Sequence, residues 1–153
     1  MDISDLDGCL AAASAGELGT WLTEFLLHGA NPNPALAEEL ALGPDRLFLD
    51  PVPVPLDRVR RTTGPDAGDL LAVDPDLWEA KVAMLATAVQ SGWNPQPLLV
   101  MSLTPDTMLV RDGNYRLEAL RRAGRGVHHV IFLFPDGDGA GDLVGPADLG
   151  RST

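Results

Sequence analysis

The residues best placed to do chemistry lie in the stretch 110–124, VRDGNYRLEALRRAG. An Asp-Gly-Asn turn joins a valine-rich run to a short helical pattern, and Arg116 lies one turn into that pattern. At about 100° per residue, Arg116 shares a helix face with Leu120 and Ala123, near the middle of the apolar side. A buried guanidinium without a partner is costly, so Arg116 requires a carboxylate or an anionic ligand.

Two arrangements meet this requirement, and the residues alone leave both open. In the first, the N–H groups and dipole at the helix start bind a phosphate, Gly113 lets the backbone approach it closely, and Arg116 adds a bidentate contact. In the second, Asp112 or Asn114 caps the helix, and Arg116 pairs with an internal acid such as Asp57.

Charge and composition narrow the function classes. The chain has 153 residues, 22 of them acidic and 11 Lys or Arg, with a formal net charge of −11. A general nucleic-acid binder needs a positive surface, so nucleic acid is not an expected partner. The arginines nevertheless gather in two segments, 58–61 and 111–125, and Lys81 is the only lysine. This grouping is compatible with a local anion site and equally with surface ion pairs.

The length fits one domain with a small appendage, and 45% hydrophobic residues indicate a soluble globular protein. No stretch approaches the roughly 20 apolar residues of a membrane span. The acidic start MDISDLDG lacks the features of a signal peptide, so we expect a cytoplasmic location and no membrane partner. The single cysteine, Cys9, excludes an internal disulfide and has no basic neighbour in sequence to activate it.

The pattern of elements predicts an α+β fold. Its order after the first helices is strand, loop, helix, strand, strand, helix, strand, which predicts a small helical cap (1–45), a mixed α/β core (46–135) and a loose Gly- and Asp-rich tail (136–153). In the first part of the chain we expect a helix at 14–29, with Ser14 and Glu17 as a capping box, and a helix from 33–34 to 42. A strand at 46–49 and a proline-containing edge strand at 50–59 follow. The remaining expected elements are a helix from Asp74-Pro75 to Gly92, a hairpin on either side of 104–106, a helix from 114 to 123 and a strand at 127–134.

VRDGNYRLEALRRAG and the later VHHVIFLF, preceded by VPVPLDRV and NPQPLLV, resemble the ParB/sulfiredoxin fold. The similarity covers residues 52–134 and is greatest to small stand-alone bacterial proteins like the ParB N-terminal domain. Their typical features are a Pro-rich PPLIV strand, a strand ending in DGNHR, a helix LEALRRAG and a final apolar strand. The resemblance implies a mixed sheet with packed helices.

Three branches of that superfamily differ at the DGNYR turn, residues 112–116. Sulfiredoxins carry GCHR, and their cysteine falls on Asn114 here, so sulfinic acid reduction is not expected. Partition ParB proteins carry GERR, use CTP and continue into a helix-turn-helix domain, which this sequence does not reach. Free serine kinases carry DGHTR, which matches three of the five positions. In these kinases the turn holds the phosphates of ADP or ATP, and a glutamate elsewhere acts as the base.

The resemblance therefore implies a nucleotide-binding protein, with a kinase that uses ATP or ADP with Mg²⁺ and a small hydroxyl-bearing substrate as one form. The expected nucleotide-binding residues are Gln96, Gly113, Asn114, Tyr115 and Arg116, and the candidate catalytic residues are Asp66, Asp69 and Asp112. The alternative is a non-catalytic nucleotide-gated switch or interaction module, with the N-terminal helices as its protein-binding surface. No metal site built by the protein is expected, because the adjacent His128 and His129 point to opposite faces of a strand.

Overall fold

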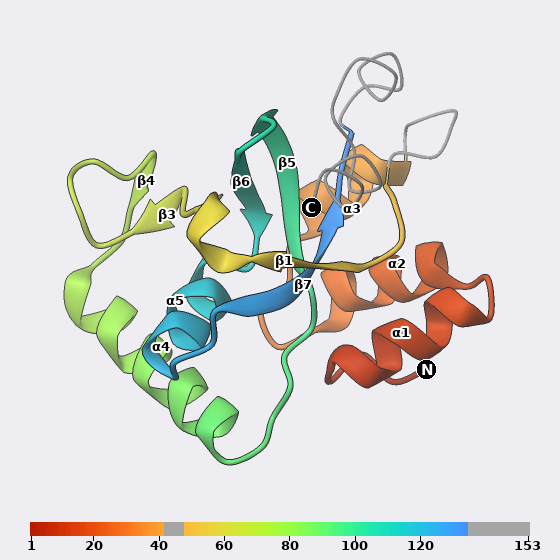
Figure 1. Ribbon diagram of the computed structural model, residues 1–153, viewed down its shortest axis with the longest axis horizontal. Coiled ribbons are helices and arrows are strands. Elements are labelled where there is room, and N and C mark those ends of the chain that lie inside the picture. Colours follow the sequence, from red (N-terminus) through yellow and green to blue (C-terminus); the bar gives the residue numbers. More distant parts are fainter. Residues whose placement is uncertain (42–47, 135–153) are drawn as a thin grey trace.

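The computed structural model describes residues 1–41 and 48–134, and its centre is a five-stranded mixed sheet with the order β1-β7-β5-β6-β2 (Figure 1). β1 (Val52–Pro55) runs antiparallel to β7 (Val127–Phe132), and β7 runs parallel to β5 (Leu98–Thr104). β5 forms an antiparallel hairpin with β6 (Thr107–Asp112), which pairs in parallel with β2 (Val59–Arg60). The predicted hairpin and last strand are confirmed, whereas the edge strand predicted at 50–59 is a strand only at 52–55, because the chain turns at 56–58 and forms β2 at the opposite edge. β1 lies at the edge because its two prolines cannot donate to a second neighbour.

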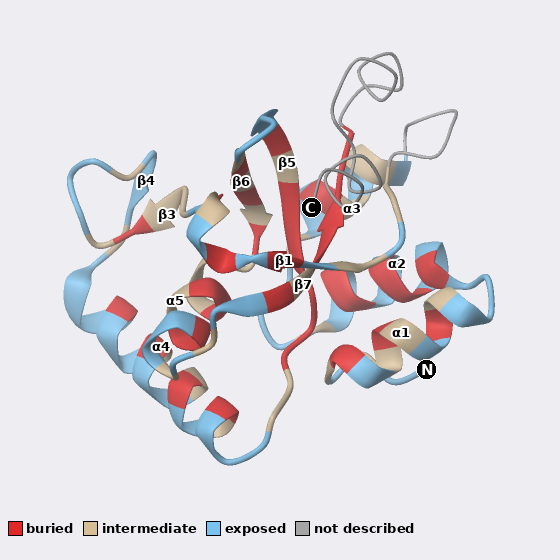
Figure 2. Cartoon of the chain, viewed as in Figure 1, coloured by how far each residue is buried: buried red, intermediate tan, exposed pale blue. Residues whose placement is uncertain are grey.

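Helices cover both faces of this sheet (Figure 1). α1 (Leu6–Ser14), α2 (Leu18–His28) and α3 (Pro34–Ala41) lie on one face, and α4 (Pro75–Gln90) and α5 (Asn114–Arg122) on the other. Figure 2 shows their buried sides turned toward the sheet and their outer sides exposed. The structure is therefore the α+β fold expected, with the N-terminal helices as one of its layers.

Strand alternation builds two separate cores, one for each helix layer. Val130 and Phe132 of β7 face α4 and α5, whereas Ile131 between them faces α1 to α3. β5 alternates in the same way, with Leu99 on the N-terminal side. The sheet is thus buried on both faces, which explains the apolar runs PLLV and VIFLF in the sequence.

Two of the predicted helix starts are confirmed by their capping bonds. The backbone N–H of Leu77 donates to the Asp74 carboxylate at 3.0 Å, and Pro75 occupies the first turn of α4. The N–H of Leu36 donates to Asn33 Oδ1 at 3.2 Å at the start of α3. Local capping chemistry therefore determines where both helices begin.

The predicted capping box at Ser14 is wrong. Ser14 is the last residue of α1, so its hydroxyl lies at the end of one helix, not at the start of the next. α1 was not expected from the sequence; Asp5 caps it by accepting from the N–H of Gly8 at 2.9 Å. Gly16, with φ of +75°, then turns the chain, and α2 begins at Leu18 without a side-chain cap.

Short elements fill the segment between β1 and α4. They are a 3₁₀ turn, η1 (Leu56–Arg58), and a parallel pair formed by β3 (Thr63–Gly64) and β4 (Leu71–Ala72). The expected strand at 46–49 falls partly outside the described residues, although Phe48 bridges to Leu133. The tail at 136–153 and the boundary at residue 45 lie outside them altogether. Within 1–41 and 48–134, no helix has the length and apolar character needed to cross a bilayer.

Candidate functional site

The site is built around the junction of β6 and α5. Gly113, with φ of +114°, links the two elements, and its carbonyl accepts from the N–H of Leu117 at 2.8 Å. Among residues 1–41 and 48–134 no side chain caps α5, so its first N–H groups have no side-chain acceptor there. A Cβ at position 113 would lie 2.9 Å from Arg116 Nη2 and 2.9 Å from a methyl carbon of Leu98. Glycine is therefore required here by both its conformation and its surroundings.

Arg116 is buried, as the helical wheel predicts, with 8% of its surface exposed. Its Nη2 donates to the carbonyl oxygen of Pro97 at 2.9 Å and lies 3.5 Å from Asp112 Oδ2. The guanidinium carbon is 5.1 Å from the centre of the Phe25 ring. Its Nε, however, has no hydrogen-bond partner among the described residues. Burial lowers the pKa of Arg116 and Asp112 raises it, and an arginine remains charged in such a setting.

The internal acid that pairs with Arg116 is thus Asp112, and not Asp57. Asp112 is 7% exposed and lies at the end of β6. Its other oxygen, Oδ1, accepts from the side chain of Asn33 at 3.2 Å, across to the N-terminal layer. Both oxygens of the Asp112 carboxylate therefore have a partner. Arg116 pairs with an internal acid, as the second arrangement requires, and its Nε is left without an acceptor among the described residues.

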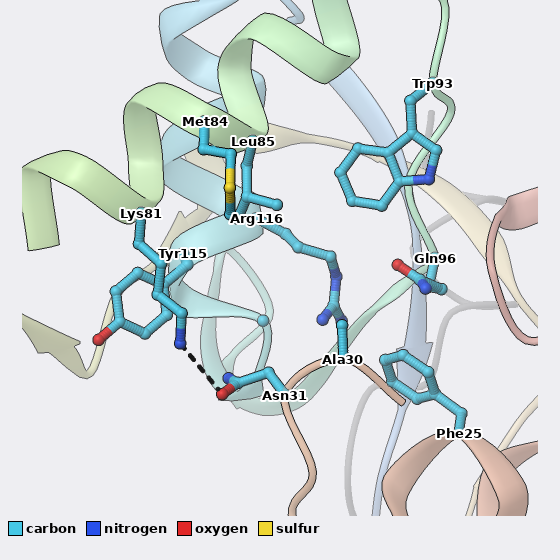
Figure 3. A pocket seen from close by; sticks show the side chains of 11 residues that line it. Phe25, Ala30, Asn31, Lys81, Met84, Leu85, Trp93, Gln96, Tyr115 and Arg116 are labelled. Carbon is cyan, nitrogen blue, oxygen red and sulfur yellow. Dashed lines mark hydrogen bonds between the residues drawn. The ribbon is translucent and has the colours of Figure 1, made fainter. Parts of the chain in front are cut away.

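A cavity of about 140 Å³ opens beside Arg116 (Figure 3). Its wall combines apolar and aromatic side chains with a few polar ones and comes from α2, the loop after α2, α4, the turn before β5, and α5. The lining residues are Phe25, Ala30, Asn31, Lys81, Met84, Leu85, Trp93, Gln96, Gly113, Tyr115 and Arg116. The cavity therefore lies where the two helix layers meet at one end of the sheet.

A second hollow of about 280 Å³ lies over the start of α5. It is lined by Asp112 and Asn114, by Thr63 of β3 and by neighbouring residues, and it shares Asn31, Gly113 and Tyr115 with the first cavity. Each hollow is smaller than the roughly 300 Å³ typical of small-molecule sites, and the two adjoin at the residues they share. We call the pair the α5 hollow.

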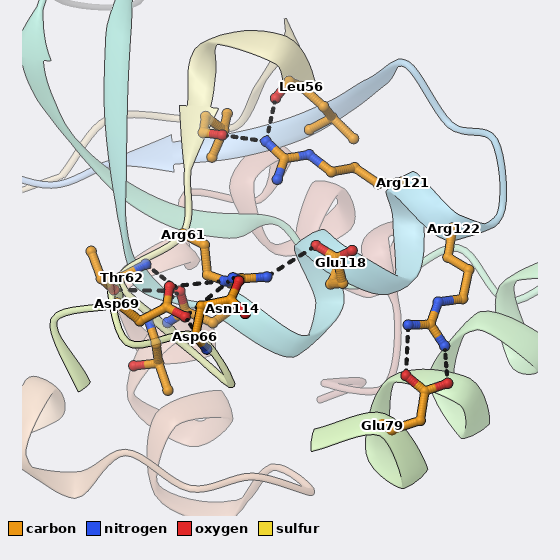
Figure 4. Close-up of polar contacts among 12 residues, drawn as sticks. Leu56, Arg61, Thr62, Asp66, Asp69, Glu79, Asn114, Glu118, Arg121 and Arg122 are labelled. Atoms are coloured by element: carbon orange, nitrogen blue, oxygen red, sulfur yellow. Dashed lines mark hydrogen bonds and ion pairs between the residues drawn. The ribbon is translucent and has the colours of Figure 1, made fainter. Parts of the chain in front are cut away.

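Asn114 connects the start of α5 to the loop before β3 (Figure 4). Its Oδ1 accepts from the N–H of Thr62 at 2.7 Å and of Thr63 at 3.0 Å, and lies 3.3 Å from the Thr62 hydroxyl. Two backbone N–H donors identify this atom as the amide oxygen. The amide nitrogen, Nδ2, then has no acceptor among the described residues, so the unused hydrogen-bonding group of Asn114, a lining residue of the hollow, is a donor.

Tyr115 is part of a stack of aromatic and cationic side chains. Its ring lies 4.6 Å from the ring of Trp78, and Lys81 Nζ lies 4.6 Å from its centre. Arg61 covers Trp78 at 5.1 Å. The stack holds the Tyr115 ring against α4, where it forms part of the wall of the hollow.

Asp66 and Asp69 are both bound to Arg61 (Figure 4). Asp69 accepts from Arg61 Nε at 3.0 Å and from Nη2 at 3.1 Å, and Asp66 Oδ2 lies 3.0 Å from Nη2. The hydrogen bond from Arg61 holds the pKa of Asp69 below its ordinary value. A carboxylate held in this way is a poor proton acceptor, and neither residue lines the α5 hollow. Their assignment as a catalytic base remains a prediction that these contacts do not favour.

Gln96, whose nucleotide-binding role remains a prediction, lines the hollow with 7% of its surface exposed. Its side-chain amide donates to the carbonyl oxygen of Ile3 at 2.8 Å, and Trp93 Nε1 donates to Ser4 at 2.8 Å. The N-terminal segment therefore positions two residues of the wall. Sequence reasoning did not foresee this link, because no local pattern pairs residues about ninety positions apart.

The described part of the chain has no candidate metal site, because it contains no group of three or more His, Cys, Asp or Glu side chains that could hold a metal ion. His128 is buried, with Nε2 at 3.0 Å from the Pro95 carbonyl oxygen, while His129 is half-buried. Burial raises the pKa of the Cys9 thiol to about 12, which makes it unreactive.

Lys81, Phe25 and Asn31 are lining residues that the sequence did not single out. One signal was available: Lys81 is the only lysine in an acidic chain, and it lies on the predicted helix beginning at Pro75. Phe25 and Asn31 gave no such signal, because the first belongs to an apolar helix stripe and the second to an ordinary turn.

Comparison with known proteins gives a limited result. No known protein family and no curated protein matches the sequence. One similar solved structure is sulfiredoxin from Arabidopsis thaliana, with 19% sequence identity and a TM-score of 0.41. The alignment covers 60% of this chain and 93% of that chain. A likeness of this size assigns no family or activity, so the functional argument is made from the site itself.

Proposed function

We propose that the protein binds a nucleotide in the α5 hollow, with its phosphates at the start of α5. The observation that carries this proposal is Arg116, a buried guanidinium that lines the hollow and whose Nε has no partner among the described residues. A buried, charged donor without an acceptor is costly, and a phosphate oxygen that displaces the atoms covering Nε would satisfy it. The uncapped N–H groups belong to the first turn of α5, the turn that also contains Arg116, and favour the same ligand.

The unused polar groups around the hollow are mainly donors. They include Arg116 Nε, Asn114 Nδ2 and the ammonium of Lys81. Asp112 is the one carboxylate among the lining residues, and Arg116 and Asn33 already bind its two oxygens. The surroundings therefore suit an anion, in spite of the net charge of −11 on the whole chain.

The apolar wall favours a nucleotide over a simple inorganic anion. Phe25, Met84, Leu85 and Trp93 form a surface on which a planar base can pack, within the same cavity as the cationic groups. A ligand with an aromatic part and a phosphate part would use both kinds of wall.

A kinase that transfers phosphate from ATP or ADP to a small hydroxyl-bearing metabolite is the catalytic form of this proposal. Mg²⁺ is commonly held by one or two carboxylates together with the phosphates. Asp112, the carboxylate of the hollow, would take that role only by exchanging its contacts with Arg116 and Asn33 for the metal, and bound Mg²⁺ would neutralise phosphate charge. Gly113, Asn114, Tyr115 and Arg116 would then hold the phosphates and orient them.

A non-catalytic nucleotide-gated switch is the second candidate, and the links to the N-terminal layer favour it. The Asp112–Asn33 and Gln96–Ile3 hydrogen bonds join the wall of the hollow to the segment before α1 and to the start of α3. A ligand that displaces Asp112 or Gln96 would thereby alter the N-terminal helices, which are the surface available to a protein partner.

Calorimetry with ATP, ADP and CTP tests the proposal. We expect the wild-type protein to bind at least one nucleotide, and Arg116→Lys, which keeps the charge but loses Nε, to weaken binding about tenfold or more. Thermal denaturation of the variant verifies that it remains folded. Absence of binding by the wild type would refute the proposal. Turnover with hydroxyl metabolites then separates the kinase from the switch.

A further inference from the structure

Lys81 lies on α4 at the wall of the α5 hollow and has no carboxylate partner in the described part of the chain. None of the ion pairs among residues 1–41 and 48–134 includes it, although the chain has 22 acidic residues. Its ammonium instead faces the Tyr115 ring at 4.6 Å. The residue as a whole is half-buried, its hydrogen bond to Asn31 is exposed, and the side chain lines the same cavity as Arg116.

Among the described residues, Lys81 makes one hydrogen bond, and it joins two elements of the wall of the hollow. Nζ donates to Asn31 Oδ1 at 3.3 Å, and Asn31 belongs to the loop after α2, opposite α4 (Figure 3). An ammonium has three donors, so one long bond to a neutral amide leaves most of its capacity unused. A long contact of this kind is easily exchanged for an anionic acceptor, because a phosphate oxygen adds the attraction between opposite charges to the hydrogen bond.

We propose that Lys81 is the second cation of the site, that it leaves Asn31 to bind the ligand, and that it selects a nucleoside diphosphate or triphosphate over a monophosphate. This inference rests on the proposed function. The flexible four-carbon stem lets the ammonium follow a second phosphate while Arg116, fixed by Pro97 and Asp112, holds the first. A monophosphate satisfies Arg116 and the start of α5, whereas each further phosphate adds charge that only a second cation balances.

The first test compares ADP with AMP by calorimetry in the wild type, Lys81→Gln and Lys81→Arg. Lys81→Gln is expected to weaken ADP binding about tenfold with little change for AMP, so that the ratio of the two affinities falls by a similar factor. Lys81→Arg retains the charge and should largely retain the ratio.

Arg122→Gln is the matched control, because it also removes one positive charge from the protein. Arg122 pairs with Glu79 at 2.7 Å on the exposed side of α4 and α5, and it lines neither part of the hollow. The ratio of ADP to AMP affinity should be unchanged in this variant. A fall equal to that in Lys81→Gln would mean that net charge alone sets the preference, and would overturn the inference.

The second test uses the fact that Lys81 is the only lysine. Mild acetylation modifies it and the α-amino group of Met1, which is exposed and serves as the internal reference in mass spectrometry. Saturating ADP should slow acetylation of Lys81 severalfold relative to Met1. Asn31→Ala should speed it in the ligand-free protein, because the acceptor is gone.

The outcomes separate this inference from the proposed function. If the wild type binds neither ADP nor AMP, the proposed function fails and the inference fails with it. If the wild type binds ADP, but Lys81→Gln keeps the same preference or ADP leaves Lys81 acetylation unchanged, the inference alone fails.

Discussion

Arg116 has five N–H donors, and the protein satisfies them unevenly. Nη2 is bound to Pro97 and faces Asp112, whereas Nε has no acceptor among the described residues. A guanidinium serving stability alone would gain from saturating its buried donors, because each buried donor left unpaired costs about 1–3 kcal/mol. The uneven use of its donors is the reason for assigning Arg116 a ligand as well as a structural partner.

His128 provides a residue-scale prediction on stability. Burial lowers its pKa from 6.5 to about 4, so the folded protein keeps the imidazole neutral while the unfolded chain protonates it. The unfolded state then binds more protons below pH 6.5, and stability falls as the pH falls from there toward 4. We expect the wild type to lose about 2 kcal/mol of unfolding free energy from this group between pH 7.5 and pH 5.

His128→Gln checks this prediction, because glutamine can still donate to the Pro95 carbonyl but does not titrate. Urea denaturation of both proteins at several pH values gives the difference. The wild type should lose more stability than the variant on acidification, since His129, whose pKa is also lowered, is common to both. Parallel curves for the two proteins would contradict the assignment.

At the residue scale, the sequence showed that an arginine lies on a buried helix face, but it did not show which group pairs with that arginine. Arg116 belongs to an apolar helix face, and that periodicity is readable without a structure. The partner of Arg116 could not be predicted in the same way. Asp112 lies before the helix, and a helical wheel gives side-chain directions only for residues within a helix. Likewise Asp66 and Asp69 are plausible acids by type, and only their contacts with Arg61 reveal that they are already engaged.

Asn114 joins three elements, and its two functions separate in a pair of substitutions. Asn114→Ala removes the acceptor of the Thr62 and Thr63 N–H groups, which should destabilise the protein by about 1–3 kcal/mol. Asn114→Asp keeps that acceptor and should be close to wild type in stability. It replaces the donor Nδ2 by a charged oxygen, however, so nucleotide affinity should fall about tenfold or more.

For both variants, urea denaturation measures the change in stability, and calorimetry measures the change in nucleotide affinity independently. Equal destabilisation by both substitutions would show that the hydrogen bonds to Thr62 and Thr63 do not determine the effect. Wild-type nucleotide affinity in a folded Asn114→Asp protein would remove Asn114 from the phosphate site.

Elements with complete local signals were predictable, and elements without them were not. α4 has a cap, a proline at its first position and apolar residues at helical spacing, and it was predicted within a few residues. α1 has three alanines and one glycine among its nine residues, and its buried side consists only of Leu6, Cys9 and Ala12, so its apolar pattern is weak and it was missed. β3 and β4 have two residues each, too few for any alternation to appear.

In the whole molecule, the hollow lies along the line where the two helix layers meet beyond the end of the sheet. Hydrogen bonds cross this line from Gln96 to Ile3 and from Asn33 to Asp112, between residues 93 and 79 positions apart. Sequence patterns extend over one or two elements, so the general α+β architecture was predictable while the composition of this wall was not. The predicted cap is accordingly part of the site.

The most direct test of the central claim, that a phosphate binds at Arg116 and the start of α5, is a nitrogen-15 NMR titration with ADP. The Nε–H signal of Arg116 can be followed together with the backbone N–H signals of Asn114 and Tyr115. These three signals should move together and saturate with one affinity, with Nε–H shifting in the direction of a stronger hydrogen bond. Saturating ADP that leaves the Arg116 Nε–H signal in place, with changes elsewhere or none, would contradict the claim.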